Sequence, residues 1–313
     1  MSETKTNLSR RDVLGRGAAL AGAALAAGVL GSRAAAEQGA ALDLSAAKEW
    51  KPARALGENA TIRVGFVGVG GRGTGLLKDS MKDKGIAVKA ICDLNAENLA
   101  KAVALVKEQQ GHEPDTYTGD DHAYRRILDR ADIDAVVLAT PCFWHGPMYL
   151  DCARAGKHFF GEKPAAITLA DADALCREVP RAGIVHGIGY QRRSSKMYNE
   201  SVKLVHEGEL GDLIQAYAAW DNVNTPRIGW HSSRAKSGDW MLEQACHTWD
   251  VLNWVVGKLP IAACGYGRKG VYEKQDPGRD VTDYFVASIE YPGMAVRYSH
   301  SWGIPNDPRF NGV

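Results

Sequence analysis

The sequence has almost no excess of either charge and no hydrophobic run long enough to cross a membrane. Its 313 residues carry a formal net charge of +1, so nothing indicates nucleic acid or an anionic membrane surface as a partner. The apolar stretch over residues 17–31 is too short to span a bilayer comfortably. We therefore expect no nucleic-acid partner and no stable membrane span.

The cysteines lack the spacing of a metal site or of a disulfide framework. None of the six forms a C-x-x-C pair, and several lie in apolar runs, which favours buried free thiols. No internal repeat is present, and no low-complexity tract occurs beyond the N-terminal segment. With 45% hydrophobic residues, the chain has the length and composition of two ordinary domains.

The N-terminus has the pattern of an export signal. Residues 9–14 read S-R-R-D-V-L, a twin-arginine pattern, and are followed by the apolar stretch and by three alanines at 34–36. This order predicts a signal peptide over residues 1–36 and a periplasmic or otherwise exported protein, with an N-terminal membrane anchor as the alternative. Because the twin-arginine route carries folded proteins, a cofactor can be bound before export. Residues 37–60 show no clear period and are predicted to be an arm or linker.

A glycine cluster follows a short apolar run after the predicted arm. Gly68, Gly70 and Gly73 fit G-x-G-x-x-G between a predicted strand and a predicted helix. In a dinucleotide-binding turn the first glycine permits the turn, the second lets the backbone approach the pyrophosphate, and the third lets the helix pack on the strand. The phosphates would lie at the helix N-terminus, beside Gly71 and Arg72. The alternative is a turn that binds no phosphate.

A second apolar run ends at Asp93, which stands 20 residues after Gly73. A dinucleotide fold places at this spacing the acid that binds the adenosine ribose hydroxyls. The charge of Asp93 would repel a 2′-phosphate, which favours NAD, while Arg72 leaves NADP as the alternative.

The next buried strand is predicted to end at Thr140 and Pro141. These residues and His145 should lie close to the nicotinamide ribose, and we assign all three to the cofactor site. The alternative is an ordinary strand end with a histidine whose hydrogen bonds are satisfied.

The two halves of the chain differ in pattern. Strands and helices alternate over residues 61–188, which predicts a Rossmann-type parallel sheet with helices on both faces. Residues 189–313 instead carry strands in succession, which predicts an α/β domain with an open, mainly antiparallel sheet. One long helix is expected over residues 240–256. The chain stops directly after a predicted strand, so we expect further residues beyond Val313 in the complete protein.

With these features in view, the sequence resembles the glucose–fructose oxidoreductase/inositol dehydrogenase family (Gfo/Idh/MocA) from about residue 61 to its end. The resemblance implies a Rossmann domain, an α/β domain with an open sheet, and an active site between them. It also implies sugar or polyol substrates and a homodimer or homotetramer formed through the open sheet. The motifs, in the family's order, are Gly68-Val69-Gly70-Gly71-Arg72-Gly73, Cys92-Asp93, Ala139-Thr140-Pro141 with His145, Gly156-Lys157-His158, Glu162-Lys163-Pro164, Gly189-Tyr190-Gln191-Arg192-Arg193, Gly208-Glu209-Leu210-Gly211 and residues 242–250.

Lys163 is the first candidate catalytic residue. It follows a predicted strand at the carboxyl edge of a parallel sheet, where ligands of such folds bind. Its ammonium can donate a hydrogen bond to the substrate oxygen that changes between hydroxyl and carbonyl. Glu162 and Pro164 would fix its backbone, and we assign Glu162 and Lys163 to the cofactor site as well. The alternative is an exposed surface lysine.

His247 and Glu243 are the second catalytic candidates. They stand four residues apart on the predicted helix and would share one face. A neutral imidazole can accept the hydroxyl proton, because its pKa lies near working pH, and the carboxylate can orient the ring or favour its charged form. The family usually has Asp in place of Glu243, and a displacement of ~1 Å matters in a catalytic site. Substrate binding is therefore an alternative role for Glu243.

The spacing of Glu243 and His247 also suits a surface ion pair or a metal site. No third and fourth ligands follow with clear spacing, so we expect no metal.

Substrate contacts are expected from the start of the second domain onward. One of its two adjacent arginines should face the pocket, and aromatic and imidazole rings offer surfaces on which sugars stack. Core packing is the alternative for the tryptophans, and Asp250 would either hold the His247 ring or be solvated. The residues assigned to substrate are Tyr190, Gln191, Arg192, Arg193, Trp230, His231 and Asp250.

Together these features predict an exported, NAD(P)-dependent oxidoreductase that acts on a sugar, polyol or sugar derivative with a tightly bound cofactor recycled in place. A second interpretation is a glycosidase or lyase that oxidises the sugar transiently, eliminates the aglycone and returns the hydride. The Tyr-containing helix motif of the family's NAD-dependent glycosidases is not found here. A third interpretation is a non-catalytic sugar or dinucleotide sensor, against which Lys163 and His247 argue.

Overall fold

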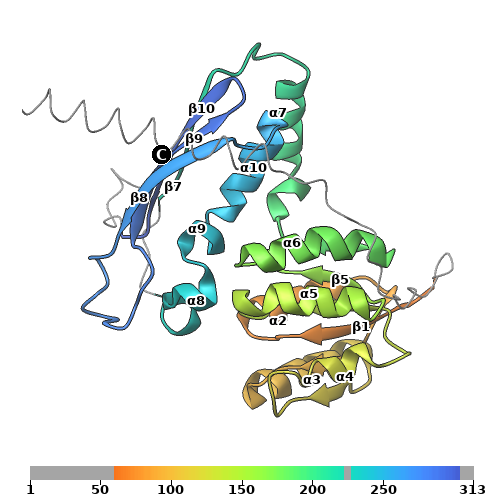
Figure 1. Ribbon diagram of the computed structural model, residues 1–313. Coiled ribbons are helices and arrows are strands. Elements are labelled where there is room, and N and C mark those ends of the chain that lie inside the picture. The colour runs from red at the N-terminus through yellow and green to blue at the C-terminus, as the bar shows by residue number, and fades with distance from the viewer. Residues whose placement is uncertain (1–59, 222–226, 304–313) are drawn as a thin grey trace, which may run out of the picture.

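The computed structural model describes residues 60–221 and 227–303, which form two domains (Figure 1). The predicted signal peptide and all but the last residue of the predicted arm lie outside the described residues. Within the described ranges no helix has both the length and the apolar character needed to cross a bilayer.

The N-terminal domain is built on a six-stranded parallel sheet with the strand order β3-β2-β1-β4-β5-β6. The order reverses between β1 and β4, and ligands of such sheets bind beyond the carboxyl ends of the strands at this point. The three-residue strand β3 is an addition to the predicted strands. The bounds are β1 (Ile62–Val67), β2 (Ile86–Cys92), β3 (Asp115–Tyr117), β4 (Ala135–Leu138), β5 (His158–Gly161) and β6 (His186–Ile188).

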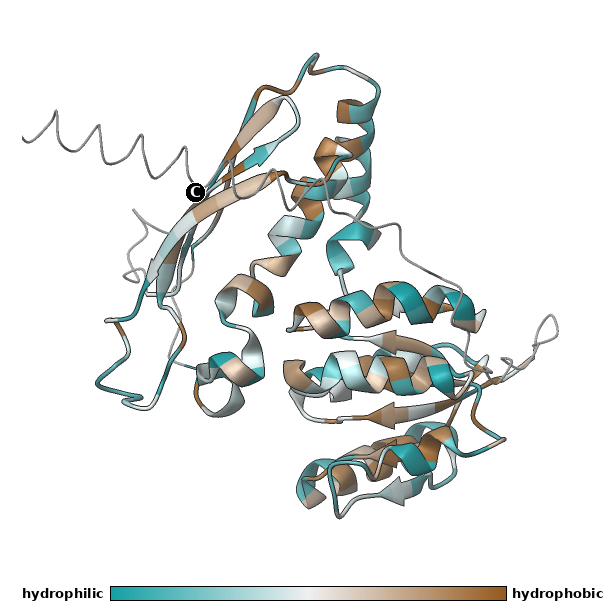
Figure 2. Ribbon diagram, in the orientation of Figure 1, coloured by the Kyte–Doolittle hydropathy of each residue, from teal (hydrophilic) through white to brown (hydrophobic). Residues whose placement is uncertain are grey.

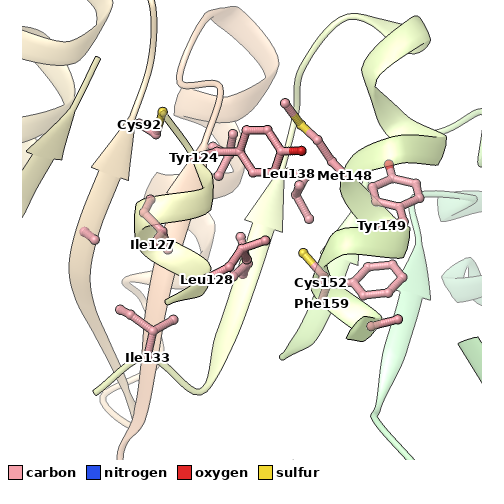
Figure 3. Packing of buried hydrophobic residues seen from close by; sticks show 14 of the residues in the cluster. Cys92, Tyr124, Ile127, Leu128, Ile133, Leu138, Met148, Tyr149, Cys152 and Phe159 are labelled. Carbon is pink, nitrogen blue, oxygen red and sulfur yellow. The ribbon is translucent and has the colours of Figure 1, made fainter. Parts of the chain in front are cut away.

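Helices cover both faces of this sheet. Successive strand residues point to opposite faces, and Phe66 and Val67 of β1 accordingly belong to two different apolar clusters. Residues of α2 and α3 complete one cluster, and residues of α4 and α5 complete the other, in which Leu138 and Phe159 contribute from the strands (Figure 3). The bounds are α2 (Gly71–Ser80), α3 (Ala96–Gln110), α4 (Arg125–Leu128), α5 (His145–Arg154) and α6 (Leu169–Glu178), with 3₁₀ turns η1 (Cys142–Trp144) and η2 (Val179–Ala182).

The predicted alternation of strand and helix in this domain is confirmed. Figure 2 shows hydrophilic and hydrophobic stretches alternating along its helices, as expected for helices with one buried face. The helix predicted over residues 96–110 has those bounds, because Asn95 caps its start by accepting a hydrogen bond from the Asn98 backbone N–H and Gly111 ends it in the left-handed conformation.

The C-terminal domain contains a four-stranded sheet with the order β7-β10-β9-β8. The pairs β10–β9 and β9–β8 are antiparallel, whereas β7 runs parallel to β10. The mainly antiparallel sheet is thus confirmed, with one parallel pair. The bounds are β7 (Gln215–Asp221), β8 (Ala262–Arg268), β9 (Tyr284–Tyr291) and β10 (Met294–Ser301).

One face of this sheet packs on helices. Side chains alternate strictly between buried and exposed along β9, and the buried set joins Trp240, Trp302 and Tyr298 in one apolar cluster. The described helices lie on the side of the sheet turned toward the Rossmann domain (Figure 1). The bounds are η3 (Gln191–Ser194), α7 (Lys196–His206), η4 (Gly229–Ser232), α8 (Arg234–Ser237), α9 (Trp240–Glu243) and α10 (Cys246–Val256).

The prediction of one continuous helix over residues 240–256 is wrong. The chain forms α9 and α10 with an interruption at Gln244 and Ala245. At this point the Ala245 N–H bonds to the Trp240 carbonyl, five residues back, and the His247 N–H bonds to the Gln244 carbonyl, three residues back. The regular pattern spans four residues, so the carbonyl of Glu243 loses its helical partner. Glu243 and His247 therefore do not share the face of one helix.

Candidate functional site

A cleft of about 1090 Å³ lies between the two domains. Its floor is formed by residues that end or follow the parallel strands on both sides of the point of reversal, among them Val67, Cys92, Ala139 and Glu162. The other wall comes from β7 and from residues 227–247 of the C-terminal domain. All predicted cofactor residues except Gly73 line this cleft.

The glycine turn between β1 and α2 has the geometry of a phosphate site. Gly68 has φ +80°, and a Cβ atom built on it would lie 2.7 Å from the Ala139 carbonyl oxygen. A Cβ on Gly73 would lie 1.9 Å from the Gly68 carbonyl oxygen, so α2 packs against the turn with no room for a side chain. Gly71, in contrast, has no neighbour within 4 Å, and no side chain caps the helix N-terminus. Free N–H groups here suit a pyrophosphate.

Asp93 holds the base of the glycine turn and borders the cleft. Its Oδ2 accepts a hydrogen bond from the Val69 backbone N–H at 2.7 Å, and its Oδ1 accepts one from the Asn95 N–H at 2.8 Å. A carboxylate retains further acceptor sites, which a ribose diol can use. The open glycine backbone and this carboxylate therefore fit a dinucleotide.

Arg72 and Glu162 meet across the cofactor side of the cleft. Arg72 Nε lies 2.6 Å from Glu162 Oε1, and the glutamate is 7% exposed whereas the arginine side chain is largely in solvent. A Cβ atom built on Gly189 would lie 3.0 Å from the Glu162 carboxylate, so the glutamate packs against the backbone of Gly189. The pair thereby connects the glycine turn to the segment that carries Lys163.

His145 connects the ends of two strands. Its Nδ1 lies 2.8 Å from the Pro164 carbonyl oxygen, and its Nε2 lies 2.9 Å from the Thr140 carbonyl oxygen. Burial lowers the pKa of His145, so the neutral ring donates to one of these carbonyls. Thr140 and Pro141 line the cleft beside it. Both ring nitrogens of His145 lie within hydrogen-bond distance of a backbone carbonyl oxygen, as expected for a histidine whose hydrogen bonds are satisfied.

Lys163 is bound by Glu243. Its Nζ donates to the Glu243 carbonyl oxygen at 2.7 Å and to Oε1 at 2.8 Å, and the second carboxylate oxygen accepts from Gln244 Nε2 at 2.6 Å. Burial acts against both charges, yet each partner stabilises the other, so the pKa of Lys163 is raised and that of Glu243 is lowered. An ammonium has three N–H groups, which leaves one for a ligand in the cleft.

His247 lines the cleft with a neutral imidazole. Burial, followed by the nearby positive charges of Lys163 and Arg192, lowers its pKa to about 4. Its Nδ1 is buried and has no hydrogen-bond partner in the described part of the chain. Glu243 makes no hydrogen bond with the ring within this part, since its carboxylate is taken up by Lys163 and Gln244. The orienting role considered for Glu243 thus passes to other side chains.

Two rings hold the His247 imidazole. Trp220, at the end of β7, lies 5.7 Å from it between ring centroids, and Tyr190 meets it edge-on at 6.1 Å. The Arg192 guanidinium lies 4.6 Å from the centre of the Trp220 ring and stabilises its position through a cation–π contact. Trp220 lines the cleft and was absent from the predicted set, although its place at the end of a predicted strand was a usable signal.

The predicted substrate residues divide into two groups. Gln191, Trp230 and His231 line the cleft, with the last two rings stacked at 3.6 Å. Tyr190 and Arg192 contact cleft residues without lining the cavity themselves. Arg193 and Asp250 form an ion pair with each other at 2.8 Å and do not border the cleft. Asp250 therefore does not hold the His247 ring.

Sequence reasoning also missed several polar residues of the cleft. Asp120 and Asp121 follow β3, which had no clear hydrophobic pattern, and Arg227 and Lys236 lie in turns and short helices without a recognisable motif. Gln244 lies within the helix predicted over residues 240–256, where no sequence pattern marked it as a cleft residue. In the described ranges, no three His, Cys, Asp or Glu side chains are grouped so as to hold a metal ion.

Comparison with known families covers both domains in order. Residues 62–190 match the family model described as the oxidoreductase family with an NAD-binding Rossmann fold. Residues 198–311 match the model described as the GFO/IDH/MocA C-terminal domain. NAD is therefore the cofactor of the N-terminal domain, as the position of Asp93 predicts.

Two curated relatives come from Shewanella. A glycosyl hydrolase family 109 protein of Shewanella woodyi is 35% identical over 184 residues, which cover 58% of this chain and 38% of the relative. An alpha-N-acetylgalactosaminidase of Shewanella oneidensis is 33% identical over 183 residues, covering 57% of this chain and 39% of the relative. The chain thus spans about two fifths of the length of these relatives.

The fold also matches solved structures. The aldose-aldose oxidoreductase of Caulobacter crescentus, solved in complex with glycerol, superposes with a TM-score of 0.67 at 24% identity. The match covers 78% of this chain and 72% of that one. At this identity the likeness establishes the two-domain fold.

Proposed function

We propose that this chain, which belongs to the GFO/IDH/MocA family of oxidoreductases with an NAD-binding Rossmann domain, oxidises a CH–OH group of a sugar, polyol or sugar derivative. The cofactor is held tightly and is recycled in place, with a second, carbonyl-bearing substrate as the acceptor of the hydride. The single observation that carries the proposal is the convergence of the Lys163 ammonium and a neutral His247 in one cleft with the glycine turn.

NAD, when bound, supplies a hydride acceptor at its nicotinamide ring. Gly70, Gly71 and the N-terminus of α2 would hold its pyrophosphate, and Asp93 its adenosine ribose. The Arg72–Glu162 pair lies beside this path and orders the wall between the phosphates and Lys163.

The protein's own groups manage the hydroxyl proton of the substrate. The third N–H of Lys163 donates to the reacting oxygen and favours its negative charge. His247 accepts the proton, because its low pKa keeps the imidazole free at neutral pH. Glu243 keeps Lys163 charged and directed into the cleft through two hydrogen bonds.

The first experiment identifies the nucleotide carried by protein purified without added cofactor. Denaturation followed by mass spectrometry should release about one NAD per chain, as expected for a cofactor recycled in place. Sugars and polyols are then screened by the absorbance of bound NADH. Protein that binds added NAD but never reduces it with any sugar or polyol would contradict the proposed reaction.

A second candidate function is a redox-assisted glycosidase. The curated relatives named as glycosyl hydrolase family 109 favour it. In this reaction oxidation of a sugar hydroxyl to a ketone would acidify the neighbouring C–H, loss of that proton would expel the aglycone, water would add to the resulting double bond, and the hydride would return to the ketone. Release of aglycone in stoichiometric amounts, with no net change in NAD, would distinguish it from net oxidation.

We further propose that the chain is exported by the twin-arginine route, on the strength of residues 9–36. Fusion of these residues to a reporter should give export that depends on Arg10 and Arg11. Lysine at both positions should block it.

A further inference from the structure

The charges that border the cleft are not evenly distributed. Two pairs are internally neutral: Arg72 with Glu162 at 2.6 Å, and Lys163 with Glu243 at 2.8 Å. The remaining carboxylates, Asp93, Asp120 and Asp121, all belong to the N-terminal domain. The remaining cations, Arg227 and Lys236, both belong to the C-terminal domain.

From this separation we propose that the substrate is a sugar bearing an anionic substituent, a carboxylate or a phosphate, that binds to Arg227 and Lys236. The inference rests on the proposed function, because it names the substrate class of the same cleft. The carboxylates on the opposite wall belong to the nucleotide side, where Asp93 would bind the adenosine ribose. An anionic group is therefore attracted to the C-terminal wall of the cleft and repelled from the N-terminal wall.

Arg227 lines the C-terminal wall of the cleft. Its guanidinium is 5.6 Å from the centre of the Trp302 ring, which fixes one side of it. It precedes the stacked pair Trp230–His231 in the cleft wall. Burial lowers the pKa of His231, and the positive charges of Arg227 and Lys163 act in the same direction. An anion on Arg227 would thus lie on the cleft wall that also carries Trp230 and His231.

Lys236 is the second cation of the C-terminal wall. It lies on α8, which packs against η1 of the N-terminal domain, and so stands where the two domains meet at the cleft. Its neighbour Arg234 pairs with Asp239 at 3.3 Å. Within residues 60–221 and 227–303, by contrast, neither Arg227 nor Lys236 has a carboxylate partner.

Exposed cations are common on protein surfaces, but these two border a ligand cleft, and among its lining residues the C-terminal domain contributes one acid, Glu243. That carboxylate is already bound by Lys163 and Gln244. A guanidinium with five N–H donors and an ammonium with three can together bind a carboxylate or phosphate through charge-assisted hydrogen bonds. A neutral sugar would leave both cations without such a partner.

The test uses full-length protein with NAD bound and sets of matched probes. Each set contains an aldohexose, its uronic acid and its 6-phosphate, in the gluco, galacto and manno series. We measure kcat and KM from bound NADH, and equilibrium binding from tryptophan fluorescence. The double variant R227Q/K236Q is compared with K274Q, which removes an exposed lysine outside the cleft.

An anionic member should bind more tightly than its neutral counterpart by roughly tenfold to a hundredfold, the range for hydrogen bonds to charged groups. R227Q/K236Q should raise its KM by the same factor, leave kcat nearly unchanged and abolish the salt dependence of binding, while K274Q should have no effect. Preference for the uronic acid or for the 6-phosphate identifies the anion.

Three results would count against these conclusions, and each points to a different error. Equal binding of anionic and neutral members would overturn the inference and leave the proposed function in place. Weaker NAD binding in R227Q/K236Q, with sugar discrimination unchanged, would overturn it by assigning the cations to the nucleotide. Bound NAD that no sugar, charged or neutral, reduces would contradict the proposed function itself.

Discussion

Lys163 Nζ donates to two acceptors of the same residue, the carbonyl oxygen of Glu243 at 2.7 Å and its Oε1 at 2.8 Å. The carbonyl is free to accept because α9 ends at Glu243, and the His247 N–H bonds to Gln244 instead. The interrupted helix thus binds the lysine of one domain to the backbone of the other. This contact sets the position of the ammonium from which the proposed chemistry proceeds.

Removing one partner of this pair should destabilise the protein more than removing both. Lys163→Met leaves the buried Glu243 carboxylate with Gln244 alone, and the free energy of unfolding should fall by about 3–5 kcal/mol. Adding Glu243→Gln should recover part of that loss, because the unpaired charge is gone. Denaturant unfolding of the single and double variants measures the coupling, and strictly additive losses would argue against it.

Turnover should depend on Lys163 and His247 more than cofactor retention does. Lys163→Met should lower kcat by on the order of 10²–10³, and His247→Gln by on the order of 10²–10⁴. NAD released on denaturation should stay near the wild-type amount in both. Lys274→Met, at an exposed position outside the cleft, serves as the control. Wild-type kcat in either cleft variant would remove that residue from the mechanism.

The pH dependence of substrate oxidation should follow the free imidazole of His247. Its pKa of about 4 lies below the ordinary value of 6.5, so kcat/KM should stay level as pH falls through 6.5 and decline only as pH approaches 4. In Lys163→Met one cause of the low pKa is absent, and the acid limb should move upward. His206→Gln, at a surface histidine of α7, should leave the profile unchanged. An acid limb centred at pH 6.5 in the wild type would show that the pKa of His247 is not lowered in the cleft.

His300 should make the folded state less stable in acid. It is 1% exposed, its Nε2 has no hydrogen-bond partner among the described residues, and burial lowers its pKa to about 4. In the unfolded chain His300 therefore becomes protonated near pH 6.5, whereas in the folded chain it stays neutral until the pH falls to about 4. The contribution of neutral His300 to the free energy of unfolding is fully present above pH 6.5 and is lost as the pH falls from 6.5 to about 4.

The loss from His300 should be on the order of 3 kcal/mol across that range. His300→Phe keeps a ring against Phe285 and Trp302 and removes the titration. Its unfolding midpoint should vary less between neutral and acid pH than that of the wild type. Equal pH dependence in the two proteins would rule out His300 as a source.

Glycine substitutions should separate packing from ligand access. Gly73→Ala places a Cβ 1.9 Å from a backbone oxygen, so the turn must move and stability should fall by about 3 kcal/mol. Gly71→Ala meets no protein atom within 4 Å and should fold normally. Thermal unfolding of the two apoproteins gives the comparison. Similar stability for both variants would show that α2 does not pack closely against the glycine turn at Gly73.

Much of the fold could be predicted from the sequence because its signals are local. The strand and helix periods of residues 61–188, the glycine turn and the capped helix over residues 96–110 each depend on neighbours along the chain. The parallel pairing of β7 with β10 is different. These strands are far apart in the sequence, and only the packing of the domain selects their direction.

The candidate site was partly predictable for the same reason. Asp93, Lys163 and His247 follow motifs at strand ends or on a helix, and all three border the cleft. Arg193 and Asp250 satisfy each other instead of facing it. Trp220, Arg227 and Lys236 reach the cleft from segments whose local pattern carries no such information.

The sequence by itself therefore determined the family, a dinucleotide cofactor with NAD favoured over NADP, and the two-domain order, since each rests on motifs with fixed local spacing. The tertiary structure alone decided which carboxylate meets which cation. Glu243 lies four residues from His247 but forms its ion pair with Lys163, 80 residues away. The physical reason is that one interrupted helical turn redirects a side chain, and a hydrogen bond depends on distances that only the packed domains define.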